Sequence, residues 1–398
     1  MTTIERTPTL EDLLARVEDI RPVIERNRDW NEEHRRLADE VYDAMLAAGL
    51  FRMVAPRAYG GYEMHPVDIY RVVHAVSKLD AAAGWNLQIA GAAAGFAVFL
   101  PQQAADDLFA DGPDVVSAGA FFPPASATRV DGGWRVTGRT PFASGCHRAD
   151  WILMPAVEME GDAPRINPVT GQPDGMAMFL PKRDIRVIEH WDTLGMRGTG
   201  SHDVAVEAAF VPEHRMAVVA PVTDPAPAFA GPLYRLNLFN GVHSESIPSV
   251  ATAERAVEDL ARLAQTKVPN YATVPLAQRE LIQHHLGKAR SLVGAAKSYL
   301  ESSISAAYEN AARDGHISEQ DKVDCQLAGC FAAEAAAHAV DLVYEAAGSS
   351  GFRLEYPFER YFRDVHTLTQ HASKSVSRYA SAGQVMLGLT PDWFLLQL

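Results

Sequence analysis

The fold is decided by a β-rich middle stretch that contains Trp134-Arg135-Val136, Trp151-Ile152-Leu153-Met154, Ala177-Met178-Phe179-Leu180 and Val204-Ala205-Val206. Gly, Pro and Asp turns separate these short runs, which is the pattern of strands in a compact β-domain. Asp131-Gly132-Gly133 stands between two alternating segments and predicts a hairpin turn, because Gly adopts a positive φ at little cost and Asp tolerates one. The stretch predicts a β-barrel or β-sandwich domain over residues 115–225.

Helical patterns flank this β-domain on both sides. Apolar residues recur at helix spacing before it, and long helical segments follow a Pro- and Ala-rich connector at 221–232. In the last part, Ser318 is expected to cap a helix that runs to about Ala347 and ends at glycine. The order of the parts predicts an α+β protein with an N-terminal helical domain (1–114) and a C-terminal four-helix bundle (226–398).

The composition narrows the class of protein. The chain has 36 Lys and Arg against 50 Asp and Glu, a formal charge of -14, which argues against nucleic acid as a partner. Cys146, Cys325 and Cys330 suit neither a disulfide framework nor a metal site, which favours a reducing compartment. The charged N-terminal residues and the lack of any apolar run of about 18 residues predict no signal peptide and no membrane span. We therefore expect a cytoplasmic protein without a metal.

Several strings, each weak alone, together resemble the acyl-CoA dehydrogenase superfamily over essentially the whole chain. The longest of them runs from Asp192 to Ser201 and reads Asp-Thr-Leu-Gly-Met-Arg-Gly-Thr-Gly-Ser. The others are Gly49-Leu50-Phe51, Tyr59-Gly60-Gly61, Phe210-Val211-Pro212, Gly348-Ser349-Ser350-Gly351-Phe352, Glu355-Tyr356-Pro357 and Arg363-Asp364. Their order and spacing imply the acyl-CoA dehydrogenase-like fold.

Two features separate flavin-dependent monooxygenases from dehydrogenases within this superfamily. Pro141-Phe142-Ala143-Ser144-Gly145-Cys146 closely resembles the monooxygenase string aromatic-x-Ser-Gly-Cys, and His371 stands where monooxygenases carry a histidine. A dehydrogenase needs a carboxylate base, and no acidic residue occurs between Asp364 and Asp392. The resemblance therefore favours a monooxygenase. An acyl-CoA dehydrogenase-like FAD enzyme with its base on another helix is the alternative, and a scaffold or binding protein without activity is a third hypothesis.

The monooxygenase branch, called group D, implies cofactors and partners. Such an enzyme takes reduced flavin from a separate NAD(P)H:flavin reductase, forms a C4a-(hydro)peroxyflavin with molecular oxygen, and hydroxylates a largely apolar, aromatic or polycyclic small molecule. Reduced FMN is expected, with FAD as the alternative, and the family implies a homotetramer. Residues 86–96 lack the His that aromatic-ring hydroxylases of this group commonly carry there. Fused rings, indole-like compounds, and nitrogen or sulfur centres therefore fit as well as a simple phenol.

Ser144 and His371 are the predicted catalytic residues. The resemblance places the Ser144 hydroxyl beside flavin N5, with Gly145 permitting close backbone approach. The alternative is a serine whose hydroxyl only hydrogen-bonds to the backbone of a turn. His371 could donate a proton or hydrogen bond to the distal peroxide oxygen, although a lone helical His is more often a surface or core residue. His366 is the second choice for this role. It lies five residues before His371, so on one helix the two side chains would face different directions and could not both point into one pocket.

Further residues are expected to line the site. Aromatic rings suit an isoalloxazine face. Arg197 could bind flavin phosphate or ribityl oxygens, and a structural role between strand and bundle is an equally weighted alternative. The expected cofactor contacts are Phe121, Phe142, Ser144, Gly145, Trp191, Arg197, Thr199, Ser201, Ser349 and Ser350. The expected substrate-pocket residues are Trp85, Asn86, Gln88, Phe96, Cys146 and His366.

Overall fold

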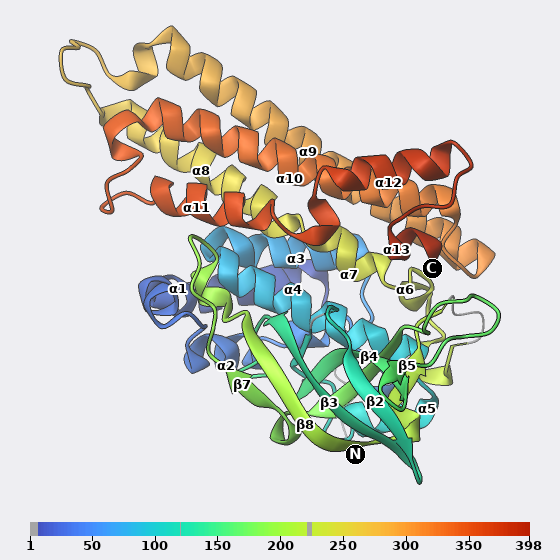
Figure 1. Ribbon diagram of the computed structural model, residues 1–398. Coiled ribbons are helices and arrows are strands. Elements are labelled where there is room, and N and C mark those ends of the chain that lie inside the picture. The colour runs from blue at the N-terminus through green and yellow to red at the C-terminus, as the bar shows by residue number, and fades with distance from the viewer. Residues whose placement is uncertain (1–6, 120, 221–224) are drawn as a thin grey trace.

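The computed structural model describes residues 7–119, 121–220 and 225–398, so the first six residues and part of the predicted connector at 221–232 lie outside the described residues. Helices come first, strands follow, and helices return, which confirms the α+β order (Figure 1). Helices α3 and α4 lie between the C-terminal bundle and the sheet. This position puts α4 at the junction of all three parts.

The N-terminal part is helical and its longest helix has a defined start. Helix α1 begins at a capping box in which Thr9 and Asp12 exchange hydrogen bonds between side chain and backbone. Helix α4 is made of small and apolar residues, so neighbouring elements approach it closely. The elements are α1 Leu10–His34, α2 Asp39–Ala47, η1 Leu50–Met53, η2 Arg57–Tyr59, α3 Pro66–Leu79, α4 Ala81–Gly95, η3 Phe96–Phe99 and α5 Gln102–Leu108.

One mixed sheet forms the middle part, and among the described residues its main path runs β7-β8-β3-β2-β4-β6-β9, with β1 and β5 pairing to β4. The predicted hairpin is confirmed, because antiparallel β2 and β3 are joined at Asp131 and Gly132, and Gly132 has φ 73°. The strands are β1 Ser117–Gly119, β2 Ala125–Val130, β3 Gly133–Ala143, β4 Trp151–Glu160, β5 Ala163–Pro164, β6 Met176–Pro181, β7 Arg186–Ile188, β8 His202–Pro212 and β9 Met216–Val218.

The C-terminal bundle is built around α10, which packs against α8, α9 and α11. The capped start of α10 is confirmed, because Ser318 Oγ accepts a hydrogen bond from the Asp321 amide at 3.1 Å, and the helix ends at Ala347. The elements are α6 Pro232–Arg235, α7 Phe239–Ser244, α8 Ile247–Thr266, α9 Glu280–Asp314, α10 Glu319–Ala347, α11 Phe358–Leu368, η10 Ala372–Lys374, α12 Ser377–Met386 and α13 Phe394–Gln397.

The prediction that one helix continues to His371 is wrong. Helix α11 ends at Leu368, and the Thr369 hydroxyl then donates to the His366 carbonyl at 2.7 Å. Such a side-chain bond to the backbone competes with helix continuation. His371 follows in an extended conformation, with φ -65° and ψ 135°. The direction of its side chain is therefore set by a turn and not by a helix face.

Two of the described helices are long and apolar enough to cross a membrane by length and composition alone. They are the segment from Ala81 to Phe99 and the segment from Glu319 to Ser350, whose apolar windows are 71% and 61% buried inside the molecule. A helix that is apolar on all sides is typical of the core of a large soluble protein. Both segments are therefore core helices of a soluble fold.

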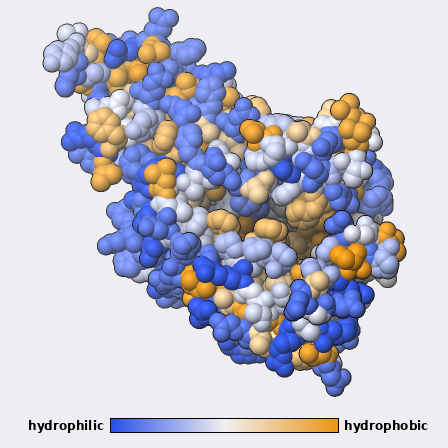
Figure 2. Space-filling view, viewed as in Figure 1, coloured by the Kyte–Doolittle hydropathy of each residue, from blue (hydrophilic) through white to orange (hydrophobic). Residues whose placement is uncertain are grey.

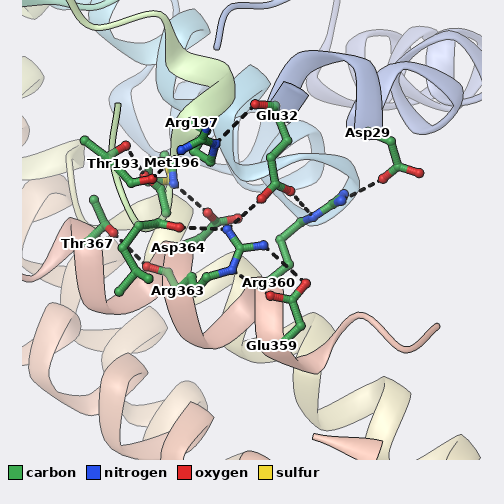
Figure 3. A network of polar contacts seen from close by, with 12 residues as sticks. Asp29, Glu32, Thr193, Met196, Arg197, Glu359, Arg360, Arg363, Asp364 and Thr367 are labelled. Carbon is green, nitrogen blue, oxygen red and sulfur yellow. Dashed lines mark hydrogen bonds and ion pairs between the residues drawn. The ribbon is translucent and has the colours of Figure 1, made fainter. Parts of the chain in front are cut away.

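A network of ion pairs joins α11 to α1 and to the loop before η5 (Arg197–Thr199), as Figure 3 shows. Glu32 on α1 is held between Arg360 and Arg363, at 2.7 and 2.6 Å. Asp364 Oδ1 accepts a hydrogen bond from the Met196 amide at 2.6 Å. The middle of α11 therefore clamps the N-terminal helices and the β-domain loop together.

Asp364 is the buried carboxyl of this network. Burial raises the pKa of Asp364 to about 7, although the hydrogen bond from the Met196 amide acts in the opposite direction. In the unfolded chain an aspartate has a pKa of about 3.9, so the unfolded state loses its proton at lower pH than the folded state does. The contribution of Asp364 to folding stability therefore falls as the pH rises from about 4 to about 7.

The variant Asp364→Asn keeps the oxygen that accepts from Met196 but cannot ionise. We expect its free energy of unfolding to match that of the parent near pH 4 and to exceed it by roughly 4 kcal/mol near pH 8. Chemical denaturation across this range measures the difference. Asp364→Ala removes the acceptor and should be less stable at every pH. A constant offset between Asp364→Asn and the parent would contradict the raised pKa.

Candidate active site

Two predicted catalytic residues meet at Trp85, which lies on α4 at the junction of the three parts. The Trp85 indole Nε1 donates a hydrogen bond to Ser144 Oγ at 2.9 Å, and the Trp85 ring makes an edge contact with the His371 ring, with 5.4 Å between centroids. Trp85 and Ser144 are buried, whereas 39% of the His371 side chain is accessible. Three segments far apart in the sequence therefore converge on one place.

A bulge at the end of β3 positions Ser144. The pairing of β3 with β8 shifts register between Thr140 and Ala143, and such a bulge redirects side chains. Phe142 lies in this bulge with φ 66°, which is uncommon for a residue other than glycine. The Phe142 ring is 64% exposed while Ser144 is buried. The bulge therefore turns the ring outward and the hydroxyl inward.

Three hydroxyls form a buried chain behind this point. Ser144 Oγ lies 2.7 Å from Ser201 Oγ, which lies 2.6 Å from Thr199 Oγ1. Thr199 Oγ1 in turn donates to the Met196 carbonyl at 2.8 Å. Thr199 and Ser201, which were expected to contact cofactor, are buried and reach the site through Ser144.

The backbone after Ser144 packs tightly against the N-terminal helices. Gly145 has φ 75°, and a Cβ at this position would lie 2.6 Å from Tyr42 Oη, so only glycine fits. Asn86 is buried next to this glycine, and neither its amide nitrogen nor its oxygen has a hydrogen-bond partner among the residues that the structure describes. Buried polar groups are rarely left unpaired. Asn86 therefore needs a partner from water or a ligand.

A buried carboxylate that the sequence motifs did not reveal holds His371. His371 Nδ1 lies 2.8 Å from Ser373 Oγ and 3.3 Å from Glu245 Oε2, and the Ser373 hydroxyl donates to the same oxygen. These contacts engage Nδ1 and leave Nε2 as the ring nitrogen for a bound group. The available signal was weak: Glu245 is the only charged residue in the stretch 244–253.

Glu245 carries its charge at neutral pH. Burial alone raises the pKa of Glu245, but the charges of His371 and Lys374 oppose this effect. Together with the hydrogen bond from Ser373, they lower the pKa below its usual value. The nitrogen of Lys374 lies 4.0 Å from the carboxylate, and burial lowers the pKa of Lys374. The carboxylate is therefore compensated by neighbouring cations, as a buried charge must be.

Aromatic side chains lie next to the site and beyond the end of α4. Figure 2 shows a hollow between the bundle and the β-domain with hydrophobic side chains in its walls. The Trp191 ring meets Phe142 edge-on at 6.2 Å, and its Nε1 donates to the Met196 carbonyl at 3.0 Å. Phe121 stacks on Phe96 at 4.7 Å and is 44% exposed. These rings offer planar apolar surface of the kind that an aromatic ligand covers.

Two expected site residues are engaged by other parts of the protein. Arg197 Nη1 donates to Asp192 Oδ1 and to the Thr193 carbonyl, both at 2.8 Å, which favours the structural alternative for this arginine. Cys146 is fully buried in the β-domain core, with its sulfur 3.7 Å from the Gly200 carbonyl oxygen. Burial raises the pKa of Cys146 to about 11. The expectation that Cys146 lines a substrate pocket is therefore corrected, because Cys146 lies in the turn after β3 with its thiol in the β-domain core.

Two other expected residues have their partners elsewhere, and a third is exposed. His366 Nε2 pairs with Asp341 on α10 at 2.8 Å, so the second-choice histidine faces the bundle surface and not the site. Ser350 Oγ accepts a hydrogen bond from Lys267 Nζ at 2.8 Å, beyond the end of α8, and Ser349 is exposed. Within one chain, the loop after α10 is therefore not part of the cluster around the two catalytic candidates.

The small residues of α4 serve close packing. A cavity of about 20 Å³ lies beside this helix, with Gln88 on its wall. Gln88 Nε2 donates to the Gly241 carbonyl at 3.0 Å, and Gln88 Oε1 has no hydrogen-bond partner within the described part of the chain. A Cβ on Gly241 would lie 2.7 Å from the Ala92 Cβ, so α4 and α7 nearly touch. The cavity has room for about one water molecule.

Comparison with known proteins gives the family. Two family models match, acyl-CoA dehydrogenase N-terminal domain over residues 13–100 and acyl-CoA dehydrogenase C-terminal domain over residues 244–376. Indole-3-acetate monooxygenase of Pseudomonas putida is 28% identical over 388 residues, which are 96% of this chain and 94% of that protein. Pigment production hydroxylase of a Rhodococcus species is 28% identical over 92% of this chain and 93% of its own length.

A solved structure agrees over the same length. XiaF from a Streptomyces species, in complex with FADH2 and glycerol, superimposes with a TM-score of 0.89 at 26% identity, covering 96% of this chain and 97% of that chain. This likeness and the two matching models confirm the fold that the resemblance implied. The chain belongs to the acyl-CoA dehydrogenase family.

Proposed function

We propose that this chain is the oxygenase component of a two-component flavin-dependent monooxygenase. The observation that carries the proposal is the meeting of one hydroxyl, Ser144, and one imidazole, His371, at the buried indole of Trp85. The relatives named indole-3-acetate monooxygenase and pigment production hydroxylase support this reaction class.

The residues present fit a flavin. Its planar ring needs apolar walls, which Trp191 and the exposed rings of Phe142 and Phe121 supply. Its polar edge needs a hydrogen-bond partner, which Ser144 Oγ offers, and Gly145 leaves the backbone open to close approach. When bound, a reduced flavin supplies the electrons that activate molecular oxygen.

The chain's own residues have separate tasks in this proposal. Ser144 holds the polar edge of the ring and is itself fixed by the Trp85 indole. His371 presents Nε2 because its other nitrogen is engaged, and an imidazole near neutral pH can deliver a proton to an oxygen atom in the site. The aromatic walls exclude water, which limits the loss of electrons to free hydrogen peroxide.

The flavin and the partners follow from the same proposal. Reduced FMN, delivered by an NAD(P)H:flavin reductase, is the proposed cofactor, with FAD as the alternative that the XiaF complex with FADH2 supports. We also propose a cytoplasmic homotetramer with the domain limits 1–114, 115–225 and 226–398. Exposed apolar side chains near the C-terminus support further assembly, and they are Val376, Met386, Leu387 and Leu389.

The proposed substrate is a small to medium aromatic or polycyclic molecule. Apolar rings line the accessible side of the site, while the buried amide of Asn86 offers a polar contact that none of the described residues satisfies. The dehydrogenase alternative needs a free carboxylate base. Glu245 is the carboxylate next to His371, and its charge is already engaged by His371 and the Ser373 hydroxyl.

An oxygen-incorporation assay tests the proposed reaction. The full chain is mixed with a flavin reductase, NADH, FMN or FAD, and indole-like or fused-ring aromatic compounds under isotope-labelled oxygen. We expect labelled product only when both reductase and flavin are present. A yellow protein with tightly held FAD that oxidises acyl-CoA thioesters without a reductase would support the dehydrogenase alternative instead.

The variant His371→Asn removes the proton donor. We expect the yield of product per NADH to fall about 100-fold, because general acid catalysis contributes roughly that much or more, while hydrogen peroxide release rises and reduced-flavin affinity is retained. His366→Asn is the matched control, since His366 faces Asp341, and it should keep the parental yield. Equal loss in both variants would reject the assignment of His371.

The variant Glu245→Gln keeps the shape of the side chain but removes the charge behind the imidazole. A neutral amide no longer stabilises a positive charge on the ring, so we expect about a tenfold loss of product yield at neutral pH, equivalent to roughly 1.4 kcal/mol. The alkaline limit of activity should also move to lower pH. Asp341→Asn, at the partner of His366, is the control. A pH profile unchanged in Glu245→Gln would show that the carboxylate is only structural.

A further inference from the structure

The hydroxyls behind Ser144 can be ordered from the number of hydrogens that they carry. Each hydroxyl has one hydrogen to donate. Thr199 Oγ1 lies 2.8 Å from the Met196 carbonyl oxygen, which can only accept, so Thr199 donates there. Ser201 must then donate to Thr199, and Ser144 must donate to Ser201. In this order every contact in the chain is a hydrogen bond.

The opposite order leaves an unmade hydrogen bond. If Thr199 donated to Ser201, the oxygen of Thr199 would face the Met196 carbonyl oxygen with no hydrogen between them. Trp191 Nε1 and the Thr199 backbone amide also donate to this carbonyl, but neither places a hydrogen between the two oxygen atoms. A buried polar contact without its hydrogen bond costs about 1–3 kcal/mol. Thr199 is 1% and Ser201 6% exposed, so bulk water does not relieve this cost.

Trp85 fixes the other end of the chain. Its indole can only donate, and it donates to Ser144 Oγ at 2.9 Å. Ser144 therefore accepts from Trp85 and donates to Ser201. One lone pair of Ser144 remains for a ligand, and no hydrogen remains.

We infer that this chain of hydrogen bonds makes Ser144 an acceptor toward flavin N5 and thereby selects reduced over oxidised flavin. The inference rests on the proposed function, which puts N5 beside Ser144. N5 of a reduced flavin carries a hydrogen that it can donate, whereas N5 of an oxidised flavin presents a lone pair that would face the lone pair of Ser144. Ser201 and Thr199 are positioning residues that act through Ser144.

The variant Thr199→Val tests the inference without altering Ser144. Valine keeps the shape but cannot accept from Ser201, which can then donate to Ser144 and free the hydrogen of Ser144 for oxidised N5. Anaerobic titrations of the full chain with oxidised and dithionite-reduced FMN give the ratio of the two dissociation constants. We expect this ratio, oxidised over reduced, to fall about tenfold. The potential of bound FMN should then become about 30 mV more negative. Thr199→Ser retains the hydroxyl and should keep the parental ratio.

A second variant and a modified ligand give independent readings. Ser201→Ala removes the acceptor for Ser144 directly and should lower the ratio in the same way. Oxidised 5-deaza-FMN has a C–H group in place of N5 and therefore no lone pair to oppose Ser144. We expect the parent to bind it more tightly than oxidised FMN, and Thr199→Val should not improve its binding.

The outcomes separate the inference from the proposed function. An unchanged ratio in folded Thr199→Val and Ser201→Ala overturns the inference. If neither variant folds, the parent decides, because equal affinity for oxidised FMN and 5-deaza-FMN also overturns it. A parent that binds no reduced FMN or FAD overturns the proposed function instead.

Discussion

The hydrogen bond from the Trp85 indole to the Ser144 hydroxyl is the contact on which the candidate site depends. Apart from Trp85, Asn86 and Gln88, helix α4 is made of small and apolar residues. A buried N–H without a partner costs about 1–3 kcal/mol, so this bond fixes the orientation of the indole. The Trp85 ring in turn supports His371. One bond therefore holds a helix, a strand end and a turn of the bundle in a single arrangement.

Unusual backbone conformations surround this bond, and the ion-pair network stabilises one of them. Phe142 and Met196 have φ of 66° and 54°, and such residues cost about 1–3 kcal/mol each. The Met196 amide donates to Asp364, while its carbonyl accepts from Thr199 and Trp191. The clamp in Figure 3 therefore ends at the same residue that orients the hydroxyl chain. The turn at Met196 therefore has two roles. Its amide binds helix α11, and its carbonyl sets the direction of the hydrogen bonds that lead to Ser144.

Local signals predicted the fold, whereas tertiary contacts decide much of the site. Periodicity and capping predicted helix α10 and the three-part order because these signals lie within a few residues. Ser144 and His371 were predicted through family resemblance. Glu245 was missed because its partner Ser373 lies 128 residues away, and a lone acidic residue indicates nothing by itself. Cys146 belonged to the right motif, but the packing of its thiol into the β-domain core leaves no local signature in the sequence.

The position of Glu245 explains why this site offers an imidazole and not a carboxylate. Acyl-thioester oxidation needs a carboxylate that removes a proton, and such a charge would repel the negative charge that develops on oxygen. Here the carboxylate lies behind His371, where Lys374 compensates it. An imidazole backed by an anion can carry a positive charge toward that oxygen. In the proposed mechanism, a carboxylate behind the imidazole therefore serves proton delivery and not proton removal.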